Sequence, residues 1–160
     1  MNVLHRLCVA LLLAAPLAHG SSAEPGKVIA GWVEKISLVE PALTLKAKLD
    51  TGAKTSSIHA VNVEPFMRDG DRWVKFDLLL EDVDDKQHTV HMEKPKVRRV
   101  RIKDNDGDDD RRAVVELEFC FDGRRHVAEF TLAERTDYIY DVLLGREFLQ
   151  GVAVVDPEST

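Results

Sequence analysis

The chain has 160 residues, of which 44% are hydrophobic, and its formal net charge is −6 at pH 7. This length suits one domain with a hydrophobic core large enough to fold alone. The acidic balance excludes a typical nucleic-acid-binding protein, which needs a basic face to neutralise phosphates.

The first residues are typical of a secretory signal peptide. A short stretch with one positive charge, Arg6, precedes an unbroken apolar run and then a region of small residues. The apolar run is too short for a bilayer-spanning helix, which needs about 20 residues. We expect residues 1–23 to be cleaved after Ala23, with Gly20 as the alternative cleavage position and an uncleaved membrane anchor as the alternative interpretation. Residues 24–160 would then form a periplasmic or secreted domain without a membrane span.

The first half of this domain predicts short strands separated by turns. Val28–Ile36 is rich in β-branched residues and predicts a strand. After Pro41, Leu43–Leu49 alternates apolar and polar residues, which predicts a half-buried strand that runs directly into Asp50. Further strands are predicted at Ser56–Val61 and Trp73–Leu80.

The second half begins with a segment whose structure is hard to predict. Residues 81–112 are polar, charged and poorly patterned, and they include the acidic run 104–110. This run does not fit a calcium-binding loop, because the first and twelfth ligand positions fall on Ile102 and Ala113. We interpret it as a solvated hairpin tip.

The remaining segments indicate an all-β fold. Val114–Phe121 and His126–Leu132 flank Asp122-Gly123 and predict a hairpin. Cys120 is the single cysteine after residue 23, so no internal disulfide can staple this domain. A short helix at Arg146–Gln150 and a last strand at Val152–Val155 complete the predicted elements.

Asp50 is the most informative residue, because a carboxylate at the end of an apolar strand is costly to bury. Leu49 and Ile58 flank the following turn, which should therefore be partly buried. Thr51 offers a hydroxyl, and Gly52 lets the backbone fold back so that amide groups point at the carboxylate. Two such turns face to face would share one proton between two carboxylates. One carboxylate would then activate water while the other protonates the substrate.

The segment Leu49–Ala53 resembles the catalytic turn of retropepsins, the single-lobed aspartic proteases, and Val142–Leu149 resembles their second signature. The resemblance implies an all-β, retropepsin-like single-lobe acid protease barrel with one short C-terminal helix. Because the sequence has one Asp-Thr-Gly, the active site would need Asp50 from each of two chains in a homodimer. The implied site residues are catalytic Asp50, the turn residues Thr51, Gly52 and Ala53, and the structural second motif Gly145 and Arg146.

The chain is even more similar to a bacterial group labelled "ATP-dependent zinc protease", which is regarded as retropepsin-like. The residues that carry this similarity are 47–57, Arg111–Val115 and Leu143–Arg146. Some members of the group occur beside ATP-grasp glutamate ligases, which implies a peptide substrate that contains glutamate. The resemblance covers nearly the whole domain.

One position differs from the viral retropepsins. In those enzymes the second residue after Asp-Thr-Gly is acidic and pairs with the arginine of the Gly-Arg helix, whereas this chain has Lys54. Arg146 therefore needs another partner, and we expect Lys54 to pair with Glu147. The flap that closes over substrate has no recognisable signature, and we expect it within Trp73–Arg112.

The zinc and ATP of the group's label are not supported by the residues. His88 and His91 lie three apart with Glu93 nearby, but there is no His-Glu-x-x-His helix, cysteine cluster or phosphate-binding glycine loop. We therefore expect no metal and no other cofactor. Trp32 and Trp73 are expected either in the core or in a cleft.

Three functions remain open. The leading hypothesis is an aspartic endopeptidase that acts at mildly acidic pH through water activated between two Asp50 carboxylates. The second is a non-catalytic peptide-binding or regulatory module on the same fold, because Lys54 and the unrecognised flap depart from the active enzymes. The third is a metal-dependent hydrolase, motivated by His88 and His91.

Overall fold

The computed structural model describes residues 26–103 and 109–160. The predicted signal peptide lies outside these residues, as does the acidic run up to Asp108. Strands dominate the described part of the chain, and its one helix has four residues. The expected all-β fold class with one short C-terminal helix is therefore confirmed.

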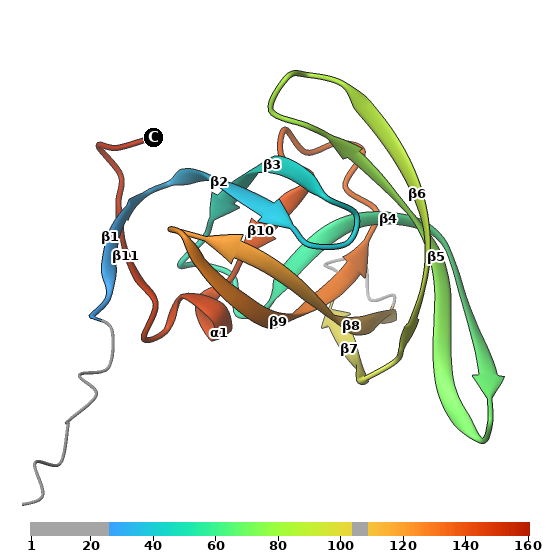
Figure 1. The fold of residues 1–160 in the computed structure, drawn as a ribbon. Helices are drawn as coiled ribbons and strands as arrows, with labels where there is room; N and C mark the ends of the chain where they lie inside the picture. The colour runs from blue at the N-terminus through green and yellow to red at the C-terminus, as the bar shows by residue number, and fades with distance from the viewer. Residues whose placement is uncertain (1–25, 104–108) are drawn as a thin grey trace, which may run out of the picture.

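A closed barrel forms the body of the molecule (Figure 1). The barrel closes because β10 pairs with β3 on one side and with β4 on the other. The β3–β10 and β4–β9 pairs are parallel, and the other neighbouring pairs are antiparallel. In the order of pairing, the barrel strands are β10 (Val142–Leu144), β3 (Leu43–Leu49), β2 (Val33–Leu38), β8 (Asp109–Phe121), β9 (Arg124–Ala133) and β4 (Ser56–Arg68).

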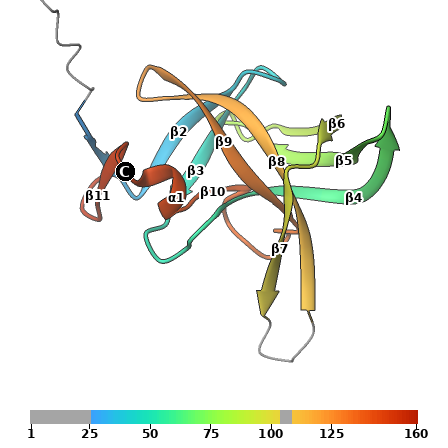
Figure 2. The same cartoon turned by 90° about the horizontal axis from the view of Figure 1, so that it is seen from below.

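A three-stranded ribbon and a separate hairpin extend from the barrel. The far part of β4 pairs with β5 (Asp71–Glu81), and β5 pairs with β6 (Gln87–Pro95), forming a ribbon at the side of the barrel (Figure 1). The separate hairpin joins β7 (Arg98–Lys103) to β8 and projects away from the barrel in Figure 2. The poorly patterned segment 81–112 thus contains β6 and β7. These two strands could not be predicted from hydrophobic alternation, because β6 buries only Met92 and β7 carries mostly basic residues.

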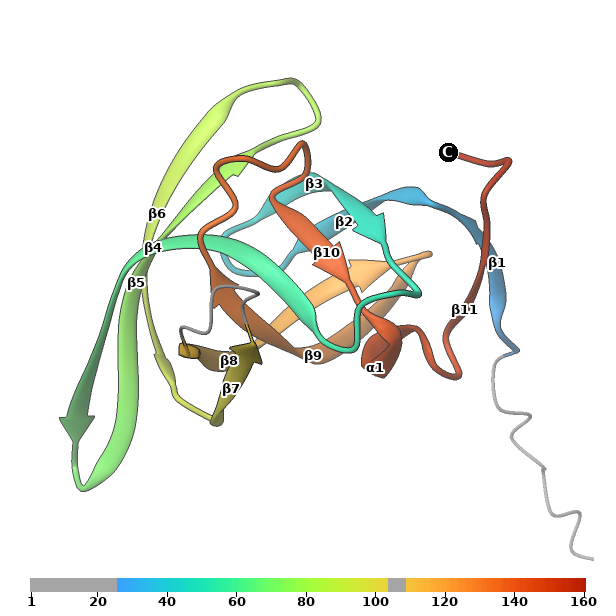
Figure 3. The ribbon, with the colours of Figure 1, turned by 180° about the vertical axis from the view of Figure 1, so that it is seen from behind.

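The two ends of the domain lie together beside the barrel (Figure 3). β1 (Val28–Gly31) pairs in parallel with β11 (Ala153–Asp156), and α1 (Arg146–Leu149) leads from β10 toward this pair. The prediction of one strand over Val28–Ile36 is therefore wrong. The chain bends at Trp32, so that β1 joins the terminal sheet and β2 joins the barrel. No helix in the described ranges is long and apolar enough to cross a membrane.

The barrel interior is the hydrophobic core. On β3, Leu45, Ala47 and Leu49 are all buried, as the alternating pattern predicted. Phe119 of β8 is fully buried, and its ring centroid lies 5.5 Å from that of Phe130 and 5.1 Å from that of Phe148. The core therefore links the barrel strands to α1.

Replacing Phe119 with alanine tests this core. Because the ring is fully buried among other aromatic rings, we expect Phe119→Ala to lower the free energy of unfolding by about 3–5 kcal/mol. Urea denaturation followed by circular dichroism measures the loss. Met67→Ala is the control, because Met67 is 63% exposed on the outer ribbon and should change stability by about 0.5 kcal/mol or less. Equal losses in the two variants would contradict the described core.

Candidate active site

Asp50 lies where β3 ends. Hydrogen bonds join its backbone to β10 and its side chain to the turn that follows. Its amide donates to the carbonyl of Leu144 on β10, at 2.9 Å. Its Oδ1 accepts from the amide of Gly52 at 2.8 Å and from the amide of Ala53 at 3.3 Å. The turn thus aims two backbone donors at one carboxylate oxygen.

The other carboxylate oxygen of Asp50 faces Lys48. The Lys48 Nζ lies 3.1 Å from Asp50 Oδ2, and the Asp50 side chain is 25% exposed. Burial raises the pKa of Asp50, but the hydrogen bond and charge of Lys48 and the amides of Gly52 and Ala53 together outweigh it. The net effect is a pKa below the ordinary aspartate value of 3.8, so the carboxylate is ionised at neutral pH.

Arg146 locks the second sequence motif onto this turn. Its Nη1 donates to the carbonyls of Thr51 at 2.9 Å and Gly52 at 2.8 Å. Its own amide donates to the carbonyl of Ala53 at 2.9 Å. In the viral enzymes the corresponding arginine pairs with an acidic residue. Here Arg146 instead binds backbone carbonyls of the Asp50 turn.

The expected pair between Lys54 and Glu147 is present. The two charged groups are 3.6 Å apart, and Arg98 lies 3.4 Å from the other oxygen of Glu147. These side chains are substantially exposed, so the pairs contribute little to stability. The Thr51 side chain is exposed and forms no hydrogen bond within the described residues.

Glycine is required at position 145 because another part of the backbone lies close to it, and not because of its backbone angles. Its φ of −95° suits any residue. However, a Cβ built there would lie 2.5 Å from the carbonyl oxygen of Thr55. The Gly145 amide also donates to the buried Ser56 hydroxyl at 3.1 Å. All six predicted site residues thus belong to one interlocked unit.

Asp50 opens into a cavity of about 350 Å³. Larger cavities elsewhere contain none of the six predicted site residues, so size does not identify the site. Trp32 lines the cavity and packs edge-on against Tyr140, which places this tryptophan in a cleft. The complete lining is Trp32, Lys48, Asp50, Arg135, Asp137, Tyr138, Ile139, Tyr140 and Leu143.

Sequence reasoning assigned no role to Lys48 or Arg135. Lys48 could have been found, because it precedes Asp50 by two positions on an alternating strand and therefore points to the same side. Arg135 has no local signal. It reaches the cavity because β9 runs parallel to the start of β4, which brings the loop after β9 beside Asp50. The pKa of Arg135 lies below the ordinary arginine value, and burial is the main cause.

Most of the residues that line the cavity come from the loop after β9. None of the described residues of Trp73–Arg112, where we expected the flap, lines it. That location of the flap stays a prediction.

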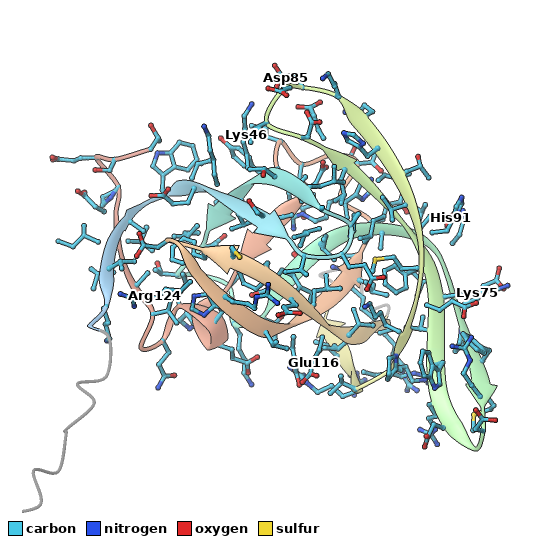
Figure 4. All side chains as sticks on the ribbon, in the orientation of Figure 1. Lys46, Lys75, Asp85, His91, Glu116 and Arg124 are labelled. Carbon is cyan, nitrogen blue, oxygen red and sulfur yellow. The ribbon has the colours of Figure 1, made fainter. Side chains whose placement is uncertain are left out.

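The two histidines considered as metal ligands each pair with an aspartate. His88 lies 2.7 Å from Asp82, and His91, on the outer ribbon in Figure 4, contacts Asp77. Within residues 26–103 and 109–160, no group of three or more His, Cys, Asp or Glu side chains is arranged to hold a metal ion.

Comparison with known proteins places these features in a family. The family model described as "Retropepsin-like aspartic endopeptidase RimB" (RimB-like) matches residues 29–160. A crystal structure of a Legionella pneumophila protein of unknown function (DUF785) has 32% sequence identity and a TM-score of 0.69. The match covers 83% of this chain and 95% of that one.

Curated relatives include two proteins named "Probable alpha-L-glutamate ligase". The one from Shewanella pealeana is 36% identical over 129 residues, which are 81% of this chain and 28% of the relative. The one from Desulfotalea psychrophila is 34% identical over 137 residues, 85% of this chain and 29% of the relative. The chain therefore spans less than a third of the length of these relatives.

Gly145→Ala tests the contact between the two motifs. The added methyl group would collide with the Thr55 carbonyl, so we expect a loss of about 1–3 kcal/mol in the free energy of unfolding. Chemical denaturation measures it. Gly26→Ala is the matched control, because no atom lies within 4 Å of the position that its added methyl group would take. If Gly145→Ala were as stable as Gly26→Ala, the close approach would be refuted.

Lys48→Met tests the charge beside Asp50. Without the ammonium group, the pKa of Asp50 should rise, because the burial that raises it remains. Titration of the Asp50 side-chain carboxyl by ¹³C NMR measures the shift. Lys46→Met is the control, because Lys46 lies on the same strand but pairs with Asp85 at 3.0 Å (Figure 4). The same Asp50 pKa in wild type and Lys48→Met would contradict the ion pair.

The same variant has a predicted effect on acid stability. The pKa of Asp50 is lower in the folded than in the unfolded chain, so ionised Asp50 stabilises the fold above the ordinary aspartate value of 3.8. This contribution is lost as the pH falls through the folded-state pKa. Lys48→Met should therefore lose less stability than wild type between neutral pH and pH values below 3.8, as denaturation at a series of pH values measures. Parallel losses in the two proteins would contradict the linkage.

Proposed function

The chain belongs to the RimB-like family of retropepsin-like aspartic endopeptidases, and on this basis we propose that it hydrolyses peptide bonds with Asp50 as its catalytic carboxylate. The observation that carries the proposal is the Asp50 carboxylate itself. It opens into a cavity, accepts two backbone hydrogen bonds, and sits on a turn clamped by Arg146.

The proposed mechanism needs a second copy of the chain. A single chain supplies one Asp-Thr-Gly, so a homodimer would bring Asp50 of a second copy to the same water molecule. Two adjacent carboxylates cannot both ionise easily, and the pair would share one proton. The ionised carboxylate would take a proton from water as the oxygen attacks the peptide carbonyl. The protonated one would polarise that carbonyl and then supply a proton to the leaving nitrogen.

Lys48 affects the protonation state that this mechanism requires. It favours the ionised form of Asp50, whereas the proton-sharing pair needs one neutral carboxyl group. A second carboxylate at the same oxygen would compete with Lys48 for that position. We therefore propose activity at mildly acidic pH, where the pair holds one proton.

We propose a glutamate-containing peptide or protein as the substrate. The curated relatives are named as glutamate ligases, and the parts that they share with this chain cover 81% and 85% of it. We also propose that the protein is periplasmic or secreted after removal of residues 1–23, and that it belongs to the subgroup labelled "ATP-dependent zinc protease". The mechanism uses two carboxylates and water and requires no metal.

A binding module without turnover is the second candidate. The observation that favours it is the ion pair of Asp50 with Lys48, which occupies the carboxylate in the single chain. In that case the protein would remain monomeric and bind peptides without cleaving them.

Asp50→Asn tests the proposed function. Because the neutral amide cannot act as a general base, we expect peptide cleavage to fall by at least about 100-fold. A peptide library assayed by mass spectrometry across pH measures the loss. Asp85→Asn is the matched control, because Asp85 also pairs with a lysine of β3 but lies at the outer hairpin tip (Figure 4).

Four outcomes distinguish the candidate functions. Inhibition by pepstatin and indifference to a chelator support the aspartic mechanism. Full activity of Asp50→Asn would exclude it, and loss of activity with a chelator alone would favour a metal hydrolase. A monomer in sedimentation that binds peptides but cleaves none would favour the binding module.

A further inference from the structure

Arg135 is a buried cation that has no carboxylate at salt-bridge distance in the described part of the chain, although Asp141 and Asp50 lie near enough to raise its pKa. The residue is 7% exposed. Its Nε donates to the carbonyl of Tyr140 at 3.0 Å, and its Nη1 donates to the Ser57 hydroxyl at 2.9 Å. Both acceptors are neutral. Asp141 and Asp50 favour its charged form without a direct hydrogen bond, so a carboxylate from outside the fold can still gain a charge-assisted hydrogen bond to this guanidinium.

Arg135 has further hydrogen-bond donors, and it lines the same cavity as Asp50. Among the described residues no hydrogen bond to Nη2 exists, yet Nη2 is not one of the fully buried, unsatisfied polar atoms. It therefore keeps access to solvent, and the solvent-filled space that Arg135 lines is the cavity shared with Asp50. A free Nη2 and the second Nη1 hydrogen form the fork that binds a carboxylate through two hydrogen bonds.

The cavity walls suit an acidic side chain with an aliphatic stem. The Tyr138 ring centroid lies 4.5 Å from the Arg135 guanidinium carbon, so an aromatic ring packs against the guanidinium. Trp32, Leu143 and the highly exposed Ile139 add apolar surface around the opening. Such walls can pack against methylene groups while the arginine receives the carboxylate.

Basic residues continue beyond Arg135. A second cavity of about 390 Å³ reaches Ala133 and Glu134, directly before Arg135, and is lined by Lys96, Arg99 and Arg111. Burial, followed by the charges of Arg99 and Arg72, lowers the pKa of Lys96. Positive charge is thus concentrated beside the Asp50 cavity, although the whole chain is acidic.

We infer that Arg135 is a specificity-determining residue, which binds the side-chain carboxylate of a substrate residue, glutamate in first place, next to the bond positioned at Asp50. The inference rests on the proposed function of this site. Beyond the proposed function, it assigns substrate recognition to Arg135. It also assigns the next residues of an acidic peptide to the neighbouring basic surface. A purely structural Arg135, which only anchors the loop after β9, would be indifferent to the charge of the peptide.

Peptide binding without turnover tests the inference first. The full domain carrying Asp50→Asn is titrated into two dye-labelled hexapeptides, one alternating serine with glutamate and one alternating serine with glutamine, and fluorescence anisotropy gives each Kd. We expect the glutamate peptide to bind about tenfold tighter or more, as a charge-assisted fork predicts. Adding Arg135→Gln should remove most of this preference. Adding Arg124→Gln should keep it, because Arg124 is exposed and lines neither cavity (Figure 4).

Several results would overturn the inference. Equal affinity for the two peptides would do so, as would a preference that survives Arg135→Gln, or a loss of affinity that is equal for both peptides. If Arg135→Gln does not fold, Arg135→Lys decides, because it keeps the charge but loses the fork. A reduced preference in Arg135→Lys supports the inference, and an unchanged preference contradicts it.

Cleavage assays separate this inference from the proposed function. If wild type cleaves both peptides with equal kcat/KM and Asp50→Asn cleaves neither, the protease assignment stands and the role of Arg135 fails. If wild type cleaves neither peptide but binds the glutamate peptide through Arg135, the protease assignment fails and the carboxylate site stands.

Discussion

The hydrogen bonds between the Asp50 turn and the Gly145–Arg146 segment join the ends of two strands that are distant in the sequence. The Asp50 amide binds Leu144, and Arg146 binds the carbonyls of Thr51 and Gly52. The strand that ends at Leu144 is also the one that closes the barrel. The same contacts therefore close the barrel and shape the site. Gly145 permits the close approach to the Thr55 carbonyl that both require.

This closure gathers charged side chains of both signs around one small opening, which is lined by Lys48 and Arg135 and by Asp50 and Asp137. Asp50 is flanked by Lys48, and Arg135 lines the same cavity with part of its guanidinium unoccupied. Within the described residues, Arg135 has no carboxylate at salt-bridge distance. A carboxylate that reaches this guanidinium would therefore gain a charge-assisted hydrogen bond, whether it comes from another copy of the chain or from a substrate. The proposed acidic substrate would use this guanidinium, and the proposed dimer would place a second carboxylate beside Asp50.

Much of the fold could be predicted where the hydrophobic pattern was strong. Leu43–Leu49 was placed correctly because one face of the strand is buried and the other is not. β6 and β7 were missed because they lie on extended hairpins, where β6 buries only Met92 and the sequence of β7 is mostly basic. At the site, the two motifs were visible because their residues are contiguous. Arg135 could not be found, since only the parallel pairing of β4 and β9 brings it to Asp50.

Subunit mixing shows most directly whether Asp50 works together with Asp50 of a second chain. Wild type is mixed with increasing amounts of Asp50→Asn at fixed total concentration, with time for subunits to exchange, and peptide cleavage is measured. If each site needs two carboxylates, activity should fall with the square of the wild-type fraction. Activity that falls only in direct proportion to that fraction would show that each chain works alone and would contradict a site shared between two chains.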